Sequence, residues 1–533
     1  MRCKNGAVVS AHRLASVAGV MMLEQGGNAV DAVIATQLAL AVVYPSAGNI
    51  GGGGFFVARL KNGKNITIDY REMAPGNASR DMYLDVSGNA QTKLSIDGHL
   101  AAGVPGTIAG LFACMKYAKL PFKKLIEPAI QLAENGFAIT AAQARAFNDL
   151  KDEFIKLNTS RPVFVKNDPW KEGNILIQKD LAATLKRIRD KGLKGFYEGE
   201  TARLIIEEMK KGNGIISEQD LKNYKVKTRT PIVFNYKGYE ILTMPPTSSG
   251  GIMLEQMLKM VEKRNIASMK FLSTQSVQLM TEVERRAFAD RSKFLGDPDF
   301  VNIPYKTLVS DKYLDERMRS YSPDKASLST DIQPGNVQPE ESHETTHISV
   351  IDKDGNAVSV TTTLNNSYGS RTVVTGAGFI LNDEMDDFSV KPGVPNMYGA
   401  IGGEANSIVP GKRMLSSMTP TIVLKNRQPY LIIGTPGGTT IPTSVFQTIV
   451  DILDFGLSAD DAVNKPKFHH QWLPDSVFVE KAFPQNVRTA LEKMGYKVRE
   501  RGAIGRTEVI KVYGKNDFEA VADKRGDDSS AGY

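Results

Sequence analysis

Cysteine is nearly absent from this sequence, which has only Cys3 and Cys114 in 533 residues. Two thiols cannot form the set of disulfides that holds a small secreted domain together, so no disulfide scaffold is expected. We predict that Cys114 is buried and that Cys3 lies in a disordered end of the chain. Stability must therefore come from a hydrophobic core, and the chain is long enough to bury a large one.

Long hydrophobic runs are missing as well. The most apolar segment, residues 29–43, contains Asp31, Thr36 and Gln37, whereas a membrane-spanning helix needs roughly 18–20 predominantly apolar residues. We predict a buried helix there and no membrane span. Residues 1–6 lack the apolar core of a signal peptide, so either the protein is cytoplasmic or its natural start lies upstream of Met1.

Charge of one sign is not concentrated anywhere in the chain. The 66 lysines and arginines exceed the 59 acidic residues by 7, and the two signs alternate, as where Lys123 and Lys124 are followed by Glu127. Proteins that bind nucleic acid gather their basic residues in a patch or stripe, so we expect no nucleic-acid partner. With 41% hydrophobic and 23% charged residues, the composition is that of a globular protein.

Common cofactor and catalytic motifs are also lacking. The glycines at 51–54 precede a predicted strand and no Lys-Ser or Lys-Thr follows them, whereas a phosphate-binding loop comes after a strand and opens a helix. No Gly-x-Ser-x-Gly elbow occurs. His343 and His347 are four residues apart, a spacing of roughly 13 Å along the predicted strand. We therefore predict neither a metal nor an organic cofactor.

The hydrophobic pattern predicts layers of helices and strands. Residues 10–25 and 28–43 have helical periodicity, and between them Gly26-Gly27-Asn28 reads as a glycine stop followed by an Asn N-cap. The region from about 100 to 330 is predicted to be mostly helical, including residues 127–135 with Pro128 in the first turn. Further predicted helices are 179–191, 198–211, 275–294, 443–454 and 487–493, and predicted strands are 55–60, 66–70, 347–351, 357–363, 421–425 and 430–434. Such layers are typical of an α/β fold with four layers (αββα), two stacked sheets between outer helices.

The segment with the clearest chemical potential is residues 341–350, Glu-Ser-His-Glu-Thr-Thr-His-Ile-Ser-Val. Cleavage before Thr345 would give that residue a free α-amine, whose ordinary pKa of about 7.7–8.0 lets it accept the proton of its own hydroxyl. Thr345 would then be base and nucleophile at once, and its hydroxyl would first attack the carbonyl of Glu344. Threonine is also common in strands because it is β-branched, so a Thr-Thr pair at a strand start can be purely structural. These residues alone leave the structural and the nucleophile interpretations open.

Several other motifs occur together with this segment, in a characteristic order. They are Gly-Gly-Asn-Ala-Val-Asp-Ala at 26–32, residues 49–55, Asp-Tyr-Arg-Glu-Met-Ala-Pro at 69–75, residues 246–251, Thr-Thr-His at 345–347, Met-Asp-Asp-Phe at 385–388, Leu-Ser-Ser-Met at 415–418 and Pro-Gly-Gly at 436–438. With these motifs the chain, from about Lys4 to Tyr533, resembles the γ-glutamyltranspeptidase (γ-glutamyltransferase, glutathione hydrolase) family of N-terminal-nucleophile hydrolases.

The resemblance implies a self-cleaving enzyme. The precursor would be cut between Glu344 and Thr345 into a large subunit, residues 1–344, and a small subunit, residues 345–533, which form a heterodimer. Thr345 would take the γ-glutamyl group of glutathione or a related compound as an ester and pass it to water, an amino acid or a dipeptide. Cofactors are not implied. Family members are usually periplasmic or extracellular, which conflicts with the missing signal peptide.

The resemblance also implies roles for residues around the nucleophile. They are Arg71, Ser416 and Ser417 for the α-carboxylate of the substrate; Asp387 for its α-ammonium, with Asn365 and Glu384 beside it; Gly437 and Gly438 for the oxyanion hole; Thr363 for orienting the nucleophile; and Tyr398 for the gate of a lid loop. A planar guanidinium meets a carboxylate bidentately, and glycine lets the backbone approach a developing negative charge. Glu384 stands where some members have glutamine, which alters the charge near the ammonium.

Two other functions fit parts of this pattern. One is a cephalosporin or glutaryl acylase, or a poly-γ-glutamate-processing enzyme, of the same superfamily. The complete set for an amino-acid head group (Arg71, Asp387, Ser416, Ser417) argues against it. The other is an unprocessed protein that binds γ-glutamyl compounds without turnover, and the presence of a nucleophile with its activating partners argues against that.

Overall fold

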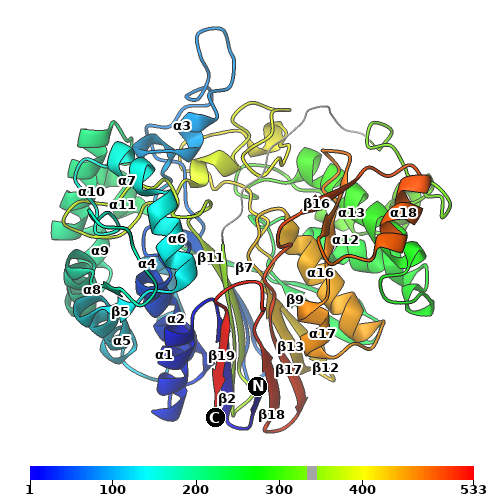
Figure 1. The fold of residues 1–533 in the computed structure, drawn as a ribbon, viewed down its shortest axis with the longest axis horizontal. Coiled ribbons are helices and arrows are strands. Elements are labelled where there is room, and N and C mark those ends of the chain that lie inside the picture. The colour runs from blue at the N-terminus through cyan, green and yellow to red at the C-terminus, as the bar shows by residue number, and fades with distance from the viewer. Residues whose placement is uncertain (333–344) are drawn as a thin grey trace.

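Two seven-stranded sheets form the centre of the molecule in the computed structural model, which describes residues 1–332 and 345–533 (Figure 1). The β10 sheet has the order β19 (Ser529–Gly532), β2 (Gly6–Ser10), β10 (Thr346–Asp352), β11 (Ala357–Thr363), β3 (Gly53–Arg59), β4 (Asn65–Asp69), β7 (Lys227–Arg229). The β13 sheet has the order β1 (Arg2–Cys3), β18 (Asp517–Val521), β17 (Glu508–Gly514), β13 (Gln428–Gly434), β12 (Thr421–Lys425), β9 (Tyr239–Thr243), β8 (Ile232–Tyr236). The predicted cleavage residue Glu344, like His343, lies outside the described residues.

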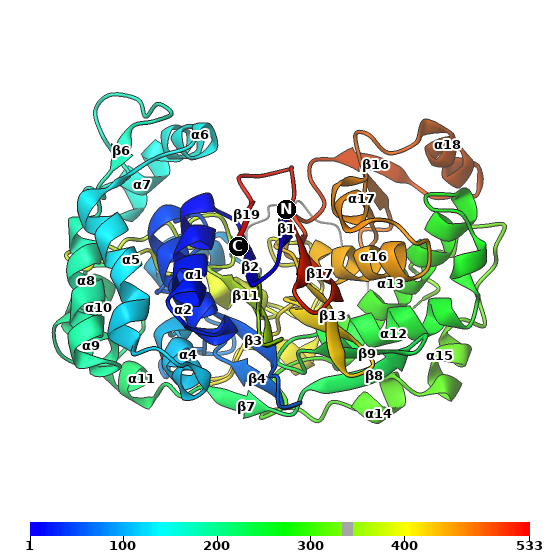
Figure 2. The same ribbon diagram turned by 90° about the horizontal axis from the view of Figure 1, so that it is seen from below.

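Helices cover the outer face of each sheet, so the order of layers is helix, sheet, sheet, helix (Figures 1 and 2). The β10 sheet side carries α1 (Arg13–Glu24), α2 (Ala29–Val43), α4 (Thr107–Cys114), α5 (Phe122–Asn135), α6 (Ala141–Asp149), α7 (Lys151–Leu157), α8 (Lys179–Lys191), α9 (Lys194–Tyr197), α10 (Gly199–Gly212) and α11 (Glu218–Asn223). The β13 sheet side carries α12 (Gly250–Glu262), α13 (Thr274–Phe294), α14 (Tyr305–Leu308), α15 (Asp311–Arg317), α16 (Thr440–Leu453), α17 (Ala459–Asn464) and α18 (Gln485–Lys493). The predicted four-layer αββα fold is confirmed.

Smaller elements lie at the margins of these layers. They are the short helix α3 (Lys93–Ile96), the pair β5 (Phe137–Ala138) and β6 (Ile175–Leu176), and the three-stranded sheet β14 (Phe468–His469), β15 (Val477–Glu480), β16 (Val498–Arg501).

Local sequence explains why α1 and α2 meet in a tight turn. Gly26 has a φ of +89°, a left-handed conformation that favours glycine. The side chain of Asn28 accepts hydrogen bonds from the backbone N–H groups of Val30 and Asp31, and the Asp31 carboxylate accepts one from the N–H of Asn28. This is a capping box, which satisfies amides that the first helical turn leaves unpaired. The predicted boundary between the two helices is therefore confirmed.

Both halves of the chain contribute strands to each sheet, and strands of the two halves pair with each other. In the β10 sheet, β10 pairs antiparallel with β2 on one side and with β11 on the other, and β11 pairs with β3. In the β13 sheet, β12 pairs with β9, and β1 pairs with β18. Residues before and after the predicted cleavage bond thus share both sheets and one core, without a domain boundary between them.

The two sheets meet through small and polar side chains close to the start of β10. The Ser349 hydroxyl donates to the Glu508 carbonyl at 3.3 Å, and the Ser359 hydroxyl donates to the Ile433 carbonyl at 3.0 Å. A side chain at Gly434 would place its Cβ 2.1 Å from the His347 ring. Glycine at 434 therefore permits the close approach of β13 to β10.

The region from 100 to 330 is mostly helical, as predicted, and also contains the short strands β5 to β9. Three details of the predicted fold are wrong. Ser10, the predicted start of the first helix, ends β2 instead, and α1 begins at Arg13. Pro128 lies inside α5, which begins at Phe122 rather than near Glu127. Cys3 is buried in β1, because that strand pairs with β18. Among the described residues, no helix combines the length and the apolar character needed to cross a bilayer.

Replacement of Gly434 by alanine tests the contact between the sheets. The added Cβ must displace the His347 imidazole from a packed core, and such overpacking lowers the free energy of unfolding by typically 1–3 kcal/mol. We expect G434A to lower the midpoint of thermal unfolding relative to the unsubstituted protein. Gly514→Ala is the matched control, since its Cβ would meet no atom within 4 Å. Equal midpoints for the two variants would contradict the proposed packing.

Candidate active site

Thr345 lies immediately before β10, at the point where that strand reaches the end of β11. Its hydroxyl oxygen is 3.5 Å from the hydroxyl oxygen of Thr363, the last residue of β11. The register explains this proximity, because Thr346 pairs with Thr362 in the antiparallel ladder. Both threonines are buried.

The Thr363 hydroxyl is held from the other side by the turn that follows β11. It accepts a hydrogen bond of 2.8 Å from the backbone N–H of Asn365, which leaves the hydroxyl proton of Thr363 able to point at Thr345. Asn365 has a φ of +80°, and its carbonyl accepts a hydrogen bond from the Tyr398 hydroxyl. Tyr398 therefore closes over the same turn that positions Thr363.

A glycine pair approaches the site from β13. Gly437 and Gly438 have φ values of +132° and +54° and directly precede Thr439, the N-cap of α16. Neither conformation suits a residue with a Cβ, and a Cβ on Gly438 would lie 2.6 Å from the Tyr398 ring. Backbone N–H groups at the N-terminus of a helix carry partial positive charge, so this turn is suited to a developing oxyanion.

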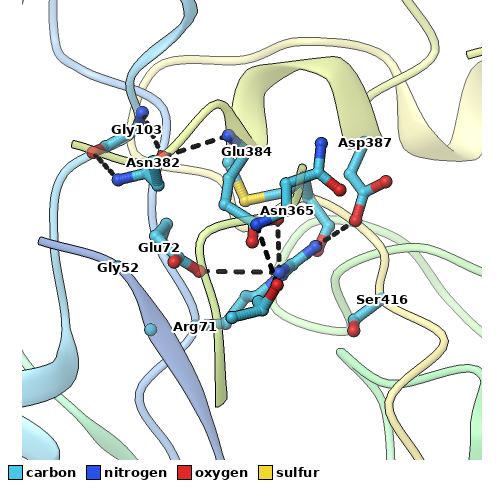
Figure 3. A network of polar contacts seen from close by, with 12 residues as sticks. Gly52, Arg71, Glu72, Gly103, Asn365, Asn382, Glu384, Asp387 and Ser416 are labelled. Atoms are coloured by element: carbon cyan, nitrogen blue, oxygen red, sulfur yellow. Dashed lines mark hydrogen bonds and ion pairs between the residues drawn. The ribbon is translucent and has the colours of Figure 1, made fainter. Parts of the chain in front are cut away.

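Arg71 brings a buried positive charge to the site. Its guanidinium pairs with Asp387 and, at 2.5 Å, with Glu384, while Glu72 lies 3.5 Å away (Figure 3). The guanidinium also donates to the carbonyl of Met414 at 3.3 Å. Burial lowers the pKa of Arg71, but the three carboxylates outweigh burial and the net shift is upward. The arginine is thus permanently charged and shared among several acids.

The acids around Arg71 outnumber it, and burial raises their pKa values. Burial raises the pKa of Glu72 to about 8, although Arg71 opposes the shift. The pKa values of Glu384 and Asp387 are shifted in the same direction for the same reason. Within the described part of the chain, both side-chain oxygens of Glu72 lack a hydrogen-bond partner. Glu72 therefore holds a proton near neutral pH, and the acidic side chains outnumber the single guanidinium of this cluster.

Ser416 and Ser417 lie in the loop before β12. The Ser416 hydroxyl accepts a 3.1 Å hydrogen bond from the N–H of Met418, and the Ser417 hydroxyl accepts one of 3.3 Å from the guanidinium of Arg291. Each hydroxyl proton is then available for an acceptor in the pocket. Arg291, near the end of α13, also donates to the hydroxyl of Ser249 at 3.1 Å.

These residues line one cavity of about 320 Å³. The predicted residues among its walls are Arg71, Thr345, Thr363, Asn365, Glu384, Asp387, Tyr398, Ser416, Ser417 and Gly438. Gly437 lies beside Gly438 in the same turn. Glu344 lies outside the described residues. Within residues 1–332 and 345–533, no group of three or more His, Cys, Asp or Glu side chains is arranged to hold a metal ion.

Comparison with known proteins places this chain in a family. The sequence model of the Gamma-glutamyltranspeptidase family matches residues 15–533. The chain belongs to the γ-glutamyltranspeptidase family. The Glutathione hydrolase proenzyme of Escherichia coli (strain K12) is 46% identical to it over 537 residues, which cover 100% of this chain and 93% of that protein.

Solved structures extend the similarity of this γ-glutamyltranspeptidase-family chain to its fold. The crystal structure of Helicobacter pylori gamma-glutamyltranspeptidase is 46% identical, covers 61% of this chain and 94% of its own, and has a TM-score of 0.60. The cephalosporin acylase from Bacillus halodurans is 27% identical, covers 100% of this chain and 96% of its own, and has a TM-score of 0.88. The fold is thus common to transpeptidases and acylases.

Six lining residues of this family member were not predicted as site residues from its sequence: Arg291, Asn396, Ala400, Met418, Thr439 and Ile441. Arg291 belongs to a correctly predicted helix, but nothing in the helical pattern distinguishes it from a surface arginine. Asn396 belongs to the predicted lid loop, and its amide donates to the Asp387 carboxylate at 3.0 Å. Arg291 could have been suspected only from the density of charged residues in α13, which is almost entirely buried.

The raised pKa of Glu72 predicts how stability depends on pH. Because its pKa in the folded state is about 8, against 4.5 ordinarily, the folded state holds a proton that the unfolded state releases between these values. The free energy of unfolding therefore falls as pH rises from about 5 to about 8, by up to ~1.4 kcal/mol per pH unit. Glu72→Gln mimics the neutral carboxyl and removes this contribution.

We expect thermal midpoints of E72Q, measured from pH 5.5 to 8.5, to rise relative to those of the unsubstituted protein as the pH increases. Glu492→Gln, on the exposed side of α18, is the control. Parallel pH curves for E72Q and the unsubstituted protein would show that Glu72 does not carry this proton.

Proposed function

We propose that this protein is a self-cleaving γ-glutamyltransferase and glutathione hydrolase in which Thr345 is the nucleophile. The observation that carries the proposal is the cavity itself. It places the Thr345 hydroxyl, a turn suited to an oxyanion, and opposite charges for an amino-acid head group within one small enclosed space. The relatives are named glutathione hydrolase proenzymes, which supports both the activity and a processed precursor.

Self-cleavage comes first in this proposal. The Thr345 hydroxyl attacks the carbonyl of Glu344, the C–N bond between the two residues breaks, and an ester links Glu344 to the threonine oxygen. Water then hydrolyses that ester. The products are a large subunit, residues 1–344, and a small subunit, residues 345–533. Because strands of one segment pair with strands of the other in each sheet, we expect the two products to stay together as a heterodimer.

The liberated α-amine of Thr345 then serves as the general base for transfer. It accepts the proton of the threonine hydroxyl as the oxygen attacks the γ-carbonyl of the donor. The N–H groups of Gly437 and Gly438 stabilise the oxyanion of the tetrahedral intermediate. The leaving amine takes the proton back, and a γ-glutamyl ester of Thr345 remains. Water releases glutamate from this ester, whereas the amine of an amino acid or dipeptide forms a new γ-glutamyl amide.

In this proposal, the head group of the substrate replaces an ion pair that two side chains of the site form with each other. Arg71 pairs with Asp387, so the site already holds one cation and one anion side by side. A substrate α-carboxylate between Arg71 and the serine hydroxyls, with the α-ammonium against Asp387, replaces that one pair with two. Asn365 and Glu384 lie at the same wall and add acceptors for the ammonium. Buried charges left unpaired are costly, which favours a zwitterionic γ-glutamyl group.

An acylase remains the second candidate, because the acylase from Bacillus halodurans shares the fold. A glutaryl group has no α-ammonium and would leave the carboxylates around Arg71 in excess. Asp387, which pairs with Arg71, can also pair with an α-ammonium, and this favours the γ-glutamyl donor. The third candidate is a protein that binds γ-glutamyl compounds without turnover. A periplasmic or extracellular location stays an expectation from the family.

Blocking the nucleophile tests self-cleavage. We expect the unsubstituted protein, incubated at neutral pH, to yield two fragments, the smaller beginning Thr-Thr-His-Ile-Ser, and Thr345→Ala to remain one chain. Thr345→Ser keeps a hydroxyl and serves as the control that still cleaves. Intact mass and N-terminal sequencing provide the measurement. An unsubstituted chain that stays whole would refute the mechanism and favour the binding protein.

Neutralising Asp387 tests recognition of the ammonium. We expect Asp387→Asn to lower kcat/KM for a γ-glutamyl anilide by about 10- to 100-fold while changing kcat/KM for a glutaryl anilide much less, since a charge-assisted hydrogen bond contributes about 1.5–3 kcal/mol. Asp386→Asn is the matched control, because the Asp386 carboxylate accepts from the Ser95 hydroxyl and the N–H of Met397 and does not line the cavity. Equal losses for the two anilides would contradict the assignment of Asp387 to the ammonium.

A further inference from the structure

A buried glutamine lies behind the cavity and contacts two of its walls. Gln471 follows β14 and is 3% exposed. Its side-chain N–H donates to the backbone carbonyl of Tyr398 at 3.0 Å, and its side-chain oxygen accepts from the Thr439 hydroxyl at 2.6 Å. The same oxygen is 2.8 Å from Nε2 of His469. Gln471 does not line the cavity, so it acts only through these neighbours.

Hydrogen-bond chemistry determines which way the Gln471 amide points. Nδ1 of His469 is 2.9 Å from the Thr443 hydroxyl, which is 3.0 Å from the Thr440 carbonyl. The backbone carbonyl of Tyr398 can only accept, so the NH2 group of Gln471 must face it. The side-chain oxygen of Gln471 is thereby directed at Thr439 and His469.

The amide joins the backbone of Tyr398, in the lid loop, to Thr439, at the start of α16. Both residues line the proposed reaction site. Thr439 is the N-cap of α16 and directly follows Gly438, whose N–H group is assigned to the oxyanion. Tyr398 packs its ring against Gly438, and its hydroxyl donates to the carbonyl of Asn365. Asn365 in turn holds the Thr363 hydroxyl. Gln471 thus ties the backbone of the lid loop to the oxyanion turn.

We infer that Gln471 is a positioning residue that couples closure of Tyr398 over the cavity to the alignment of the Gly437–Gly438 oxyanion turn. This inference rests on the proposed function and extends it to a residue outside the pocket. With the amide in place, the lid backbone and the start of α16 move as one unit. Without this amide, the backbone carbonyl of Tyr398 loses its hydrogen bond to the side chain that also holds Thr439. The reacting groups then lose their mutual alignment.

Gln471→Glu separates this role from simple packing, because it keeps the shape of the side chain. As a carboxylate, residue 471 still accepts from Thr439 and His469 but opposes an oxygen to the Tyr398 carbonyl. As a protonated carboxyl, it donates to that carbonyl again. We therefore expect kcat of Q471E for a γ-glutamyl anilide to fall at least about tenfold at pH 8, since small misplacements of reacting groups are costly. At pH 5.5 we expect Q471E to recover to within about threefold of the unsubstituted enzyme.

Gln278→Glu is the matched control. Gln278 is equally buried, donates to the Ser322 carbonyl at 2.8 Å and accepts from the Tyr321 hydroxyl at 2.8 Å. It lies 13 residues before Arg291 in α13, roughly 20 Å along the helix from the site. We expect Q278E to lower thermal stability without a pH-dependent change in kcat. A kcat of Q471E that is unchanged, or reduced equally at both pH values, would overturn the inference.

Hydrogen exchange tests the coupling without relying on turnover. We expect amides of residues 396–402 and 436–441 to exchange faster in Q471E than in the unsubstituted protein and to be unaffected in Q278E. Unchanged exchange in both segments would overturn the coupling. If the unsubstituted protein has no γ-glutamyl turnover while the exchange result holds, then the proposed function fails and the structural coupling stands. The two failures are therefore distinguishable.

Discussion

The pairing of β10 between β2 and β11 is the constraint on which the site depends. Thr345 lies at the end of a strand, so its position depends on how that strand is held. Two antiparallel neighbours hold β10 in register, and this brings the Thr363 hydroxyl close to that of Thr345. The β13 sheet packs against the same strand and supplies the glycine turn at its end. A cut before Thr345 leaves these pairings intact, so the new terminus stays in place.

Electrostatics, rather than shape alone, governs what the cavity can hold. Arg71 is buried among Glu72, Glu384 and Asp387, and burial pushes the pKa values of these acids upward. A site with such an excess of acids binds protons until a cation arrives. In the proposed function, the α-ammonium of the substrate supplies that cation and its α-carboxylate pairs with Arg71. The selectivity we propose therefore depends on these buried charges.

Much of the fold could be predicted from local pattern. The capping signal at Asn28, the period of residues 179–191 and the Thr-rich strand ending at Thr363 all correspond to observed elements. The hairpin of β8 and β9 was missed although its alternation is visible in the sequence, because helices surround it along the chain. Cys3 was misplaced because the partner of β1 lies more than 500 residues away, in β18. Local patterns do not contain such pairings.

By itself, the sequence determined the chemistry that is present: a threonine before a strand, an arginine, paired acids, serines and glycines in an order that marks the family. Only the tertiary structure decided which of these groups meet in one cavity and that Arg291 and Asn396 join them. It also decided that Gln471 contacts both Tyr398 and Thr439 from outside the cavity. The physical reason is that side-chain identity is a local property, whereas the distances between charges and hydroxyls arise from packing of segments hundreds of residues apart. Burial then changes the behaviour of those groups, as it does for Glu72.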